Sequence, residues 1–222
     1  MVPRWIKRLF HQATLGDQSF RYMFRPGPAG ECVSIDCETT GLDRGKDEII
    51  SIAAIKIRGD KILASEAFRT IVRPSVAINP EAIRIHGLRE MDVANAPLIG
   101  DILPDLLHFI GGRPIVGYYI DFDVAMLNKH VLENIGIELP NPLVEVSGIY
   151  YKRKYGDAPP GTAVDLKFAS ILRDLKLPLF NQHDAYSDAL MTAMIYVALR
   201  DMEKRDIKIP RPKIRFEEFH GG

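Results

Sequence analysis

The sequence has no excess of charge of either sign. Its 222 residues include 29 lysines and arginines and 29 aspartates and glutamates, so the formal net charge at neutral pH is zero. Proteins that cover long stretches of a polyanion usually carry a marked excess of basic residues. The composition therefore counts against a long duplex footprint, and any contact with phosphate groups must be local.

Cysteine is scarce as well, with only Cys32 and Cys37 in the chain. Both fall in one predicted strand at positions of opposite parity, so their side chains face opposite sides of the sheet and cannot form a disulfide. The sequence therefore contains no disulfide framework, which fits a reducing compartment, and we expect a cytoplasmic location.

Long apolar runs are also missing, and we expect no transmembrane segment. Near the start, an apolar stripe of Trp5, Ile6, Leu9 and Phe10 stands among basic residues, but it is too short and broken for a signal peptide or a membrane span. A basic amphipathic helix of this kind can lie on a membrane or resemble a transit segment. The ordinary alternative is a helix packed on its own domain or on a neighbour. Residues 1–30 are predicted to form this helical extension and a linker rich in proline and glycine.

The most informative stretch is the apolar strand that runs from Val33 into Asp36, Glu38 and a turn at Gly41. Because side chains alternate along a strand, Asp36 and Glu38 share one face and Ile35 and Cys37 share the other. Two neighbouring carboxylates repel each other unless a proton or a cation lies between them, and oxygen ligands of this kind suit hard divalent ions. An isolated Asp-x-Glu is usually a pair of surface acids, so the pair gains meaning only from further residues.

The remaining pattern predicts an α/β domain. With 46% hydrophobic residues, the chain can bury one sizeable core. After the Asp36 strand, residues 49–57 and 62–72 are predicted strands of an antiparallel meander. Short strands are expected over 114–117 and 143–146, and helices over 81–86, 99–110, 123–134, 165–175 and 185–201. A meander followed by alternating helices and strands predicts a mixed sheet in a domain over residues 31–203. The tail over 204–222 is either a strap across this domain or a tether to a partner.

Further candidate residues occur late in the chain. Asp123 lies near a predicted junction between a strand and a helix, and His183 and Asp188 lie near the start of the last helix. Five residues of helix would separate His183 from Asp188 by roughly 140° around the axis. The two side chains can share one site only if His183 lies in the loop before the helix.

In this order, three motifs resemble those of a known family. They are Asp36-x-Glu38, continued by Thr39-Thr40-Gly41; Asp123 in a Gly-x-x-x-x-Phe-Asp context; and His183-x-Ala-x-x-Asp188. They resemble the exonuclease motifs of the DEDDh, or DnaQ-like, 3′-to-5′ exonucleases, a family that includes the proofreading epsilon subunit of bacterial DNA polymerase III. The resemblance runs from about residue 32 to 199. It implies an RNase H-like fold with a mixed five-stranded sheet flanked by helices.

The resemblance also implies an activity, which is metal-dependent hydrolysis at the 3′ end of DNA or RNA with release of 5′-mononucleotides. Asp36, Glu38, Asp123 and Asp188 would be the ligands of two divalent ions, Mg²⁺ or Mn²⁺, and His183 the general base. The expected partner is the 3′ end of single-stranded DNA or short RNA, and a polymerase partner and a homodimer are further expectations. The alternative is a non-catalytic module that keeps the fold and binds nucleic acid or a polymerase.

Five further residues are expected to contact the substrate: Thr39, Thr40, His86, Tyr118 and Tyr119. The two threonines could equally form the turn, and His86 could be structural. Many relatives carry His-Asn where this chain has Tyr118-Tyr119, and the two tyrosines could form a platform for a base. The aromatic and basic run over residues 150–155 is either a nucleic-acid contact or an exposed helix end.

Overall fold

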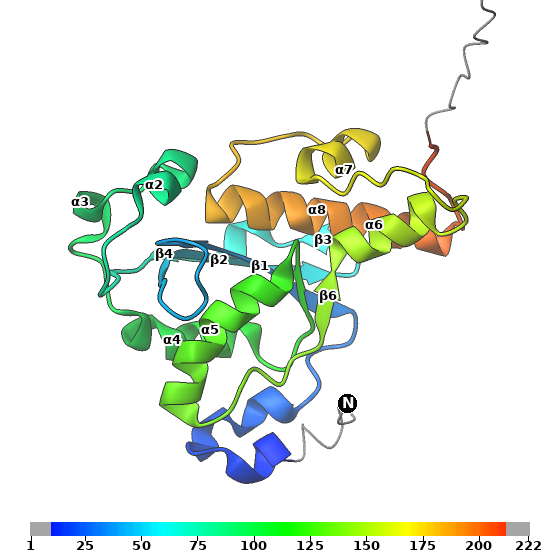
Figure 1. Ribbon diagram of the computed structural model, residues 1–222. Coiled ribbons are helices and arrows are strands. Elements are labelled where there is room, and N and C mark those ends of the chain that lie inside the picture. Colours follow the sequence, from blue (N-terminus) through cyan, green and yellow to red (C-terminus); the bar gives the residue numbers. More distant parts are fainter. Residues whose placement is uncertain (1–9, 212–222) are drawn as a thin grey trace, which may run out of the picture.

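The structure is a computed structural model that describes residues 10–211 of the chain. A mixed sheet forms its centre, and helices cover both faces (Figure 1). One core lies between the sheet and the helices α4 (Ile99–Ile110) and α5 (Ile120–Ile135). A second core lies between the sheet and α6 (Val146–Tyr155), α7 (Phe168–Asp174) and α8 (Ala185–Lys204). The predicted α/β architecture is confirmed.

The central strand is β1 (Glu31–Thr39), which pairs on both sides. It runs antiparallel to β2 (Ile49–Arg58) and parallel to β5 (Ile115–Gly117). β6 (Leu143–Glu145) extends the parallel half beyond β5. With β3 (Lys61–Ile62) beside β2, the strand order is β3-β2-β1-β5-β6, so the antiparallel meander and the parallel half meet at β1. The mixed sheet that the sequence predicts is confirmed.

The sheet has six strands rather than the expected five, because the strand predicted over 62–72 is interrupted. β3 (Lys61–Ile62) and β4 (Phe68–Ile71) both pair with β2, and the 3₁₀ turn η2 (Ala64–Glu66) separates them. Ile62 pairs with Ile57 and Phe68 with Ala54, so six steps along the returning chain match three along β2. The extra residues do not pair with β2 and form the turn η2 instead. The apolar pattern of the sequence does not predict this interruption.

The alternation predicted for β1 is confirmed by what each face contacts. Val33, Ile35 and Cys37 belong to the core shared with α4 and α5. On the other face, the Ser34 hydroxyl donates a hydrogen bond of 2.8 Å to the Ala189 carbonyl of α8. This bond fixes α8 across the face of β1 on which Asp36 and Glu38 lie.

The predicted helices are present, with shifted ends. α2 (Pro80–His86) ends at Gly87, which has a φ of +77°. α5 begins at Ile120, three residues before the predicted start, and α7 is shorter than expected. The short α3 (Glu90–Val93) was not predicted, and α6 was expected only through one interpretation of residues 150–155, as a helix end.

A helix does end at Tyr155, as one interpretation of residues 150–155 expected, but this end is only partly exposed. The side chains of Tyr150, Lys154 and Tyr155 are buried. The Lys154 ammonium forms an ion pair with Asp174, and the Tyr150 hydroxyl donates to the same carboxylate at 2.6 Å. These residues attach α6 to α7, so they are not available to nucleic acid.

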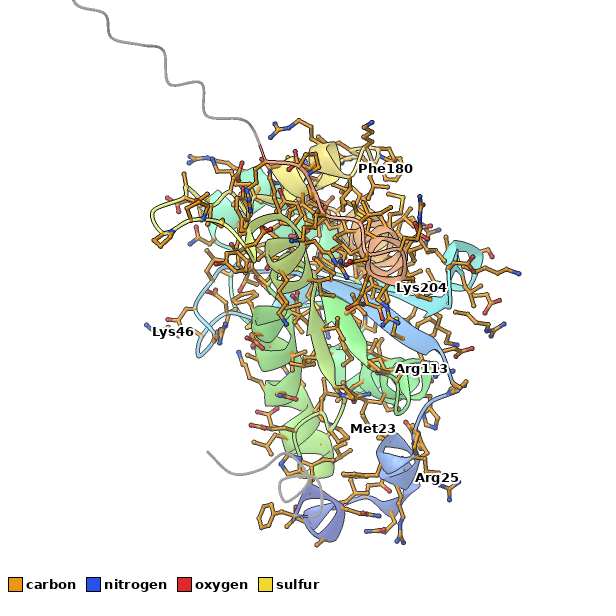
Figure 2. All side chains as sticks on the ribbon, turned by 90° about the vertical axis from the view of Figure 1, so that its right-hand side faces the viewer. Met23, Arg25, Lys46, Arg113, Phe180 and Lys204 are labelled. Atoms are coloured by element: carbon orange, nitrogen blue, oxygen red, sulfur yellow. The ribbon has the colours of Figure 1, made fainter. Side chains whose placement is uncertain are left out.

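The chain before β1 packs on the domain. Residues 10–14 are helical, and η1 (Gln18–Phe24) follows as a 3₁₀ helix. Phe20, Met23 and Phe24 join the core of α4 and α5. Figure 2 shows Met23 and Arg25 at the end of the molecule formed by η1, opposite Phe180. Trp5, Ile6 and Leu9 lie outside the described residues, and the predicted domain limits stay predictions.

The first part of the predicted tail lies across the domain. The Ile209 side chain is buried and its backbone N–H donates to the Arg153 carbonyl at 3.2 Å, while Arg211 pairs with Asp157 at 2.7 Å. Residues 205–211 therefore form a strap over α6. Among the described residues, no helix combines the length and apolarity that a membrane crossing requires.

The ion pair between α6 and α7 gives a stability prediction. We expect Asp174→Ala to lower the free energy of unfolding by about 3 kcal/mol, because it leaves the Lys154 ammonium buried without its partner. In a domain of this size the melting temperature should fall by roughly 10 °C. Asp201→Ala is the matched control, since it removes the partner of Arg205 from an ion pair whose Arg205 and Asp201 side chains are 64% and 57% exposed. That change should shift the melting temperature by about 1 °C at most. Equal shifts in thermal unfolding of the two variants would show that the buried pair has no special role.

Candidate active site

A cavity of about 400 Å³ opens at the carboxyl end of β1, where the first turns of α5 and α8 meet it. All five residues of the three sequence motifs line it: Asp36, Glu38, Asp123, His183 and Asp188. They come from segments up to 152 positions apart, between Asp36 and Asp188. The fold therefore brings together the residues that the sequence analysis singled out.

Three of the carboxylates form a compact group. Asp36, Glu38 and Asp188 each offer one oxygen, and these oxygens lie within 4.8 Å of one another. Asp188 Oδ2 accepts a hydrogen bond from the His183 backbone N–H at 2.8 Å, whereas Oδ1 is buried with no hydrogen-bond partner. A buried carboxylate oxygen without a partner is costly, and a divalent cation is a partner that such an oxygen accepts well. This donor set fits Mg²⁺ or Mn²⁺.

Asp123 stands beside this group rather than in it. It lies in the first turn of α5, is only 5% exposed, and its Oδ1 accepts a hydrogen bond of 3.0 Å from the Cys37 backbone N–H. The positive end of the helix dipole also favours a carboxylate at this position. The bond to Cys37 joins α5 to β1 between the two acidic residues of the strand.

The carboxylates raise one another's pKa values. Burial raises the pKa of Asp36 well above its ordinary range, and the negative charges of Asp123, Asp188 and Glu38 raise it further. Burial, followed by the charges of Asp188 and Asp184, raises the pKa of Glu38 to about 7. Burial also raises the pKa of Asp123 to about 7, although the hydrogen bond from Cys37 opposes it. The site therefore holds protons at neutral pH unless a cation replaces them.

His183 satisfies the geometric condition set by the sequence. It lies in the loop before α8, which begins at Ala185 with Asp184 as its N-cap, so His183 and Asp188 can reach one cavity. Its φ of +63° places a non-glycine residue in the left-handed region, which is energetically unfavourable. The hydrogen bond from its backbone to Asp188 holds this conformation, and its side chain remains exposed.

Of the other predicted contact residues, some line the cavity and others do not. Thr39 lines the cavity, but Thr40 does not: its side chain is fully buried and its hydroxyl donates to Asp47 at 2.9 Å. For Thr40 the turn-forming interpretation therefore holds. His86 lines a neighbouring cavity of about 210 Å³, which shares Glu38 and Thr39 with the larger one. Burial lowers the pKa of His86.

Tyr118 and Tyr119 both line the main cavity, and their ring centroids are 4.4 Å apart. Other lining residues were missed by the sequence analysis: Leu42, Ile85, Phe122, Phe168, Gln182 and Thr192. Phe122 stands within the second motif and could have been found there. Phe168 gives no local signal, because only the packing of α7 brings it to the Tyr118 ring, at 4.9 Å.

A mixed sheet with an acidic cluster at the end of its central strand defines an α/β domain of the RNase H-like type, and solved structures share this fold. A structure of Exonuclease X in complex with 5′-overhanging duplex DNA has a TM-score of 0.60 and 24% identity, covering 80% of this chain and 95% of that one. A zinc-bound complex of Escherichia coli exonuclease I with single-stranded DNA has a TM-score of 0.67 and 16% identity, covering 79% of this chain and 41% of that one.

The chain belongs to the exonuclease family, whose model matches residues 33–196. Among curated relatives, a PolC-type DNA polymerase III of Caldanaerobacter subterraneus is 32% identical over 77% of this chain. This chain spans only 12% of the length of that protein. The DNA polymerase III subunit epsilon of Aquifex aeolicus is 29% identical over 77% of this chain and 80% of its own length. The DnaQ-like relationship expected from the motifs is confirmed.

The raised pKa values predict how the stability of the metal-free protein depends on pH. Because the pKa of Glu38 rises from an ordinary 4.5 to about 7, the folded state binds more protons than the unfolded state between these values. The carboxylates therefore contribute stability at low pH that is lost as the pH rises through about 7. We expect the melting temperature in chelator to fall over this window.

Asp36→Asn tests the cause, since it removes one of the repelling charges. It should raise the metal-free melting temperature at pH 8 by about 2–4 °C, which corresponds to about 1 kcal/mol in a domain of this size. Asp105→Asn, at an exposed position on α4, is the control and should have no such effect. A lower melting temperature for Asp36→Asn in chelator would contradict the electrostatic account.

Proposed function

We propose that the protein is a metal-dependent 3′-to-5′ exonuclease that hydrolyses the terminal phosphodiester bond of a polynucleotide and releases 5′-mononucleotides. The observation that supports this most strongly is the convergence of Asp36, Glu38, Asp123, His183 and Asp188 on one cavity. Membership of the exonuclease family supports hydrolysis, and the order of the motifs supports the 3′-to-5′ direction and the histidine type.

The donor set supports a divalent metal requirement. Asp36, Glu38 and Asp188 would hold one ion, with Asp36 and Asp123 contributing to a second. Two such ions would stabilise the charge on the attacking and leaving oxygens of an in-line displacement at phosphorus. Without cations, the carboxylates that remain ionised would repel an anionic substrate and nothing would balance the charge at its phosphate, so we expect an absolute metal dependence.

His183 is proposed as the general base. Its side chain is exposed at the cavity while its backbone is held by Asp188 Oδ2, so the imidazole can accept a proton from the attacking water and pass it to solvent. The Asp184 carboxylate caps α8 through the backbone N–H of Ser187 at 3.0 Å, which fixes the loop that carries His183.

The proposed substrate is single-stranded DNA. Solved structures of the same fold contain an overhanging duplex and single-stranded DNA, and relatives are components of DNA polymerase III. RNA is the alternative polymer. Proteins distinguish RNA from DNA by contacts to the 2′-hydroxyl, and the motif residues do not identify such a contact. The polymerase partner and the homodimer stay predictions.

Degradation of end-labelled single strands tests the proposal. We expect 5′-labelled DNA to give a ladder of shortening products with Mg²⁺ or Mn²⁺, whereas 3′-labelled DNA should lose its label as a mononucleotide in the first step. Chelator should abolish both reactions. Cleavage that begins at the 5′ end would contradict the direction. Binding of DNA without cleavage under either metal would favour the non-catalytic module, and parallel assays with RNA identify the preferred polymer.

The general base is tested by His183→Ala. Loss of positioned proton transfer should lower kcat by about 10²- to 10⁴-fold. The affinity for single-stranded DNA should change much less, because the four carboxylates and the walls of the cavity remain. His108→Ala is the control, since His108 is exposed on α4 outside the cavity. A kcat for His183→Ala within twofold of the unmodified protein would exclude His183 as the base.

A further inference from the structure

The proposed reaction requires the substrate to approach a cavity that carries only negative charge. Among the described residues that line it, four are carboxylates and none is lysine or arginine. Divalent ions can balance the carboxylates at the scissile phosphate, but the next phosphate along the strand lies beyond them. A cation of the protein next to the cavity would meet this phosphate.

Arg44 stands in this position. Its guanidinium lies over the ring of Phe122, with Cζ 5.6 Å from the ring centroid, and Phe122 lines the cavity. The loop that carries Arg44 is fixed at its end: Asp47 Oδ2 accepts from the Asp43 backbone N–H at 2.7 Å, and the Lys129 ammonium donates to the Asp47 carbonyl at 2.6 Å. Arg44 is thus an exposed cation on an anchored loop.

Lys46 belongs to the same loop but differs from Arg44. Figure 2 shows its side chain pointing away from the body of the protein, and this side chain is 87% exposed. Its ammonium lies 3.8 Å from the Asp43 carboxylate. The Lys46 ammonium is therefore paired with a carboxylate, whereas the Arg44 guanidinium is placed by the Phe122 ring.

Two aromatic residues lie at the start of α5, and the Arg44 guanidinium contacts the ring of one of them, Phe122. Tyr119 is the N-cap of α5 and Phe122 lies in its first turn, where the Phe122 N–H donates to the Tyr119 carbonyl at 2.9 Å. Both line the cavity, and 60% of the surface of Tyr119 is exposed. Tyr119, Phe122 and Arg44 together form what we call the α5 row.

Tyr119 is held in its position at an energetic cost. Its φ of +55° is in the left-handed region, which is unfavourable for a tyrosine. The Tyr118 ring supports it from one side, and Tyr118 is fixed in turn by its hydroxyl, which donates to the Leu166 carbonyl at 3.0 Å. A large aromatic side chain in a strained conformation, exposed at the rim of a cavity, is poorly explained by packing alone.

We propose that the α5 row binds the single-stranded segment directly 5′ of the scissile phosphodiester. A base stacks on the exposed Tyr119 ring beside the half-buried Phe122 ring, and the Arg44 guanidinium contacts a phosphate of the same segment. Aromatic rings interleaved with basic groups bind single strands with little sequence preference, because every base offers a π-face. This inference rests on the proposed exonuclease function and adds to it a preference for substrates whose 3′ end is unpaired over at least two nucleotides.

Two substrates separate the α5 row from the catalytic centre. The p-nitrophenyl ester of thymidine 5′-monophosphate has one nucleotide and, on the 5′ side of the scissile bond, only the nitrophenyl leaving group with no further phosphate or base, whereas an oligothymidylate has the whole segment. Arg44→Ala and Tyr119→Ala should each lose about tenfold more kcat/KM on the oligonucleotide than on the ester, mainly through KM, as expected for a lost stacking or phosphate contact. Tyr119→Phe, which keeps the ring, should restore the oligonucleotide reaction.

The control is Arg200→Ala, because the Arg200 guanidinium lies over the Tyr196 ring in the same way, at 5.8 Å, but near the far end of α8. It should lower neither reaction. Equal losses on both substrates for Arg44→Ala, or no loss on either, would overturn the proposal.

A binding measurement distinguishes failure of the α5-row proposal from failure of the proposed exonuclease function. If the unmodified protein hydrolyses neither substrate, the exonuclease proposal fails, and fluorescence anisotropy with labelled oligothymidylate in Ca²⁺ still tests the α5 row. Loss of one phosphate contact in Arg44→Ala should lower the slope of log affinity against log salt by about 0.7. The same affinity and slope for Arg44→Ala and the unmodified protein would overturn the inference.

Discussion

Repulsion among four carboxylates at the end of β1 is the constraint to which the rest of the domain is fitted. Partial removal from water disfavours the charged form of the half-buried Asp36, as burial does for Asp123, and neighbouring carboxylates add to this cost. A fold accepts such a site only if the surrounding framework stabilises it independently. Here β1 is paired on both sides, and both of its faces are covered by helices.

Two hydrogen bonds connect the strand β1 to the helices that carry Asp123 and Asp188. The bond from Ser34 to Ala189 holds α8 against one face of β1, next to Asp188, while the bond from Cys37 to Asp123 holds the first turn of α5 at the edge between strand and helix. Each bond joins a helix to the strand within a few residues of a carboxylate. The acidic residues are thus positioned by backbone and hydroxyl groups that carry no charge, so the carboxylates remain available for cations.

The sequence predicts what depends on local periodicity and on motif order. The parity of Ser34, Asp36 and Glu38 follows from strand geometry, and the position of His183 before α8 follows from its spacing to Asp188. It does not predict features that depend on how distant segments meet. The interruption between β3 and β4 reflects a mismatch in register with β2, and Phe168 reaches the cavity only because α7 packs there. The burial of Tyr150 and Lys154 depends likewise on Asp174, twenty residues further along from Lys154.

The net charge is zero, and many of the basic side chains are already paired with acids of the protein. The proposed polyanionic substrate must therefore be met by a few basic side chains near the site. Arg58 and Arg113 pair with Glu31, and a further set pairs with acids of α7, the α6–α7 connection and the C-terminal segment: Arg153, Lys154, Lys208 and Arg211. These pairs stabilise the fold or hold the strap and leave little net field there. Arg44 differs, because its guanidinium lies over the aromatic ring of Phe122 rather than beside a carboxylate. A guanidinium on an aromatic face keeps its charge available to an incoming phosphate, so one residue at the rim can supply what the bulk composition lacks.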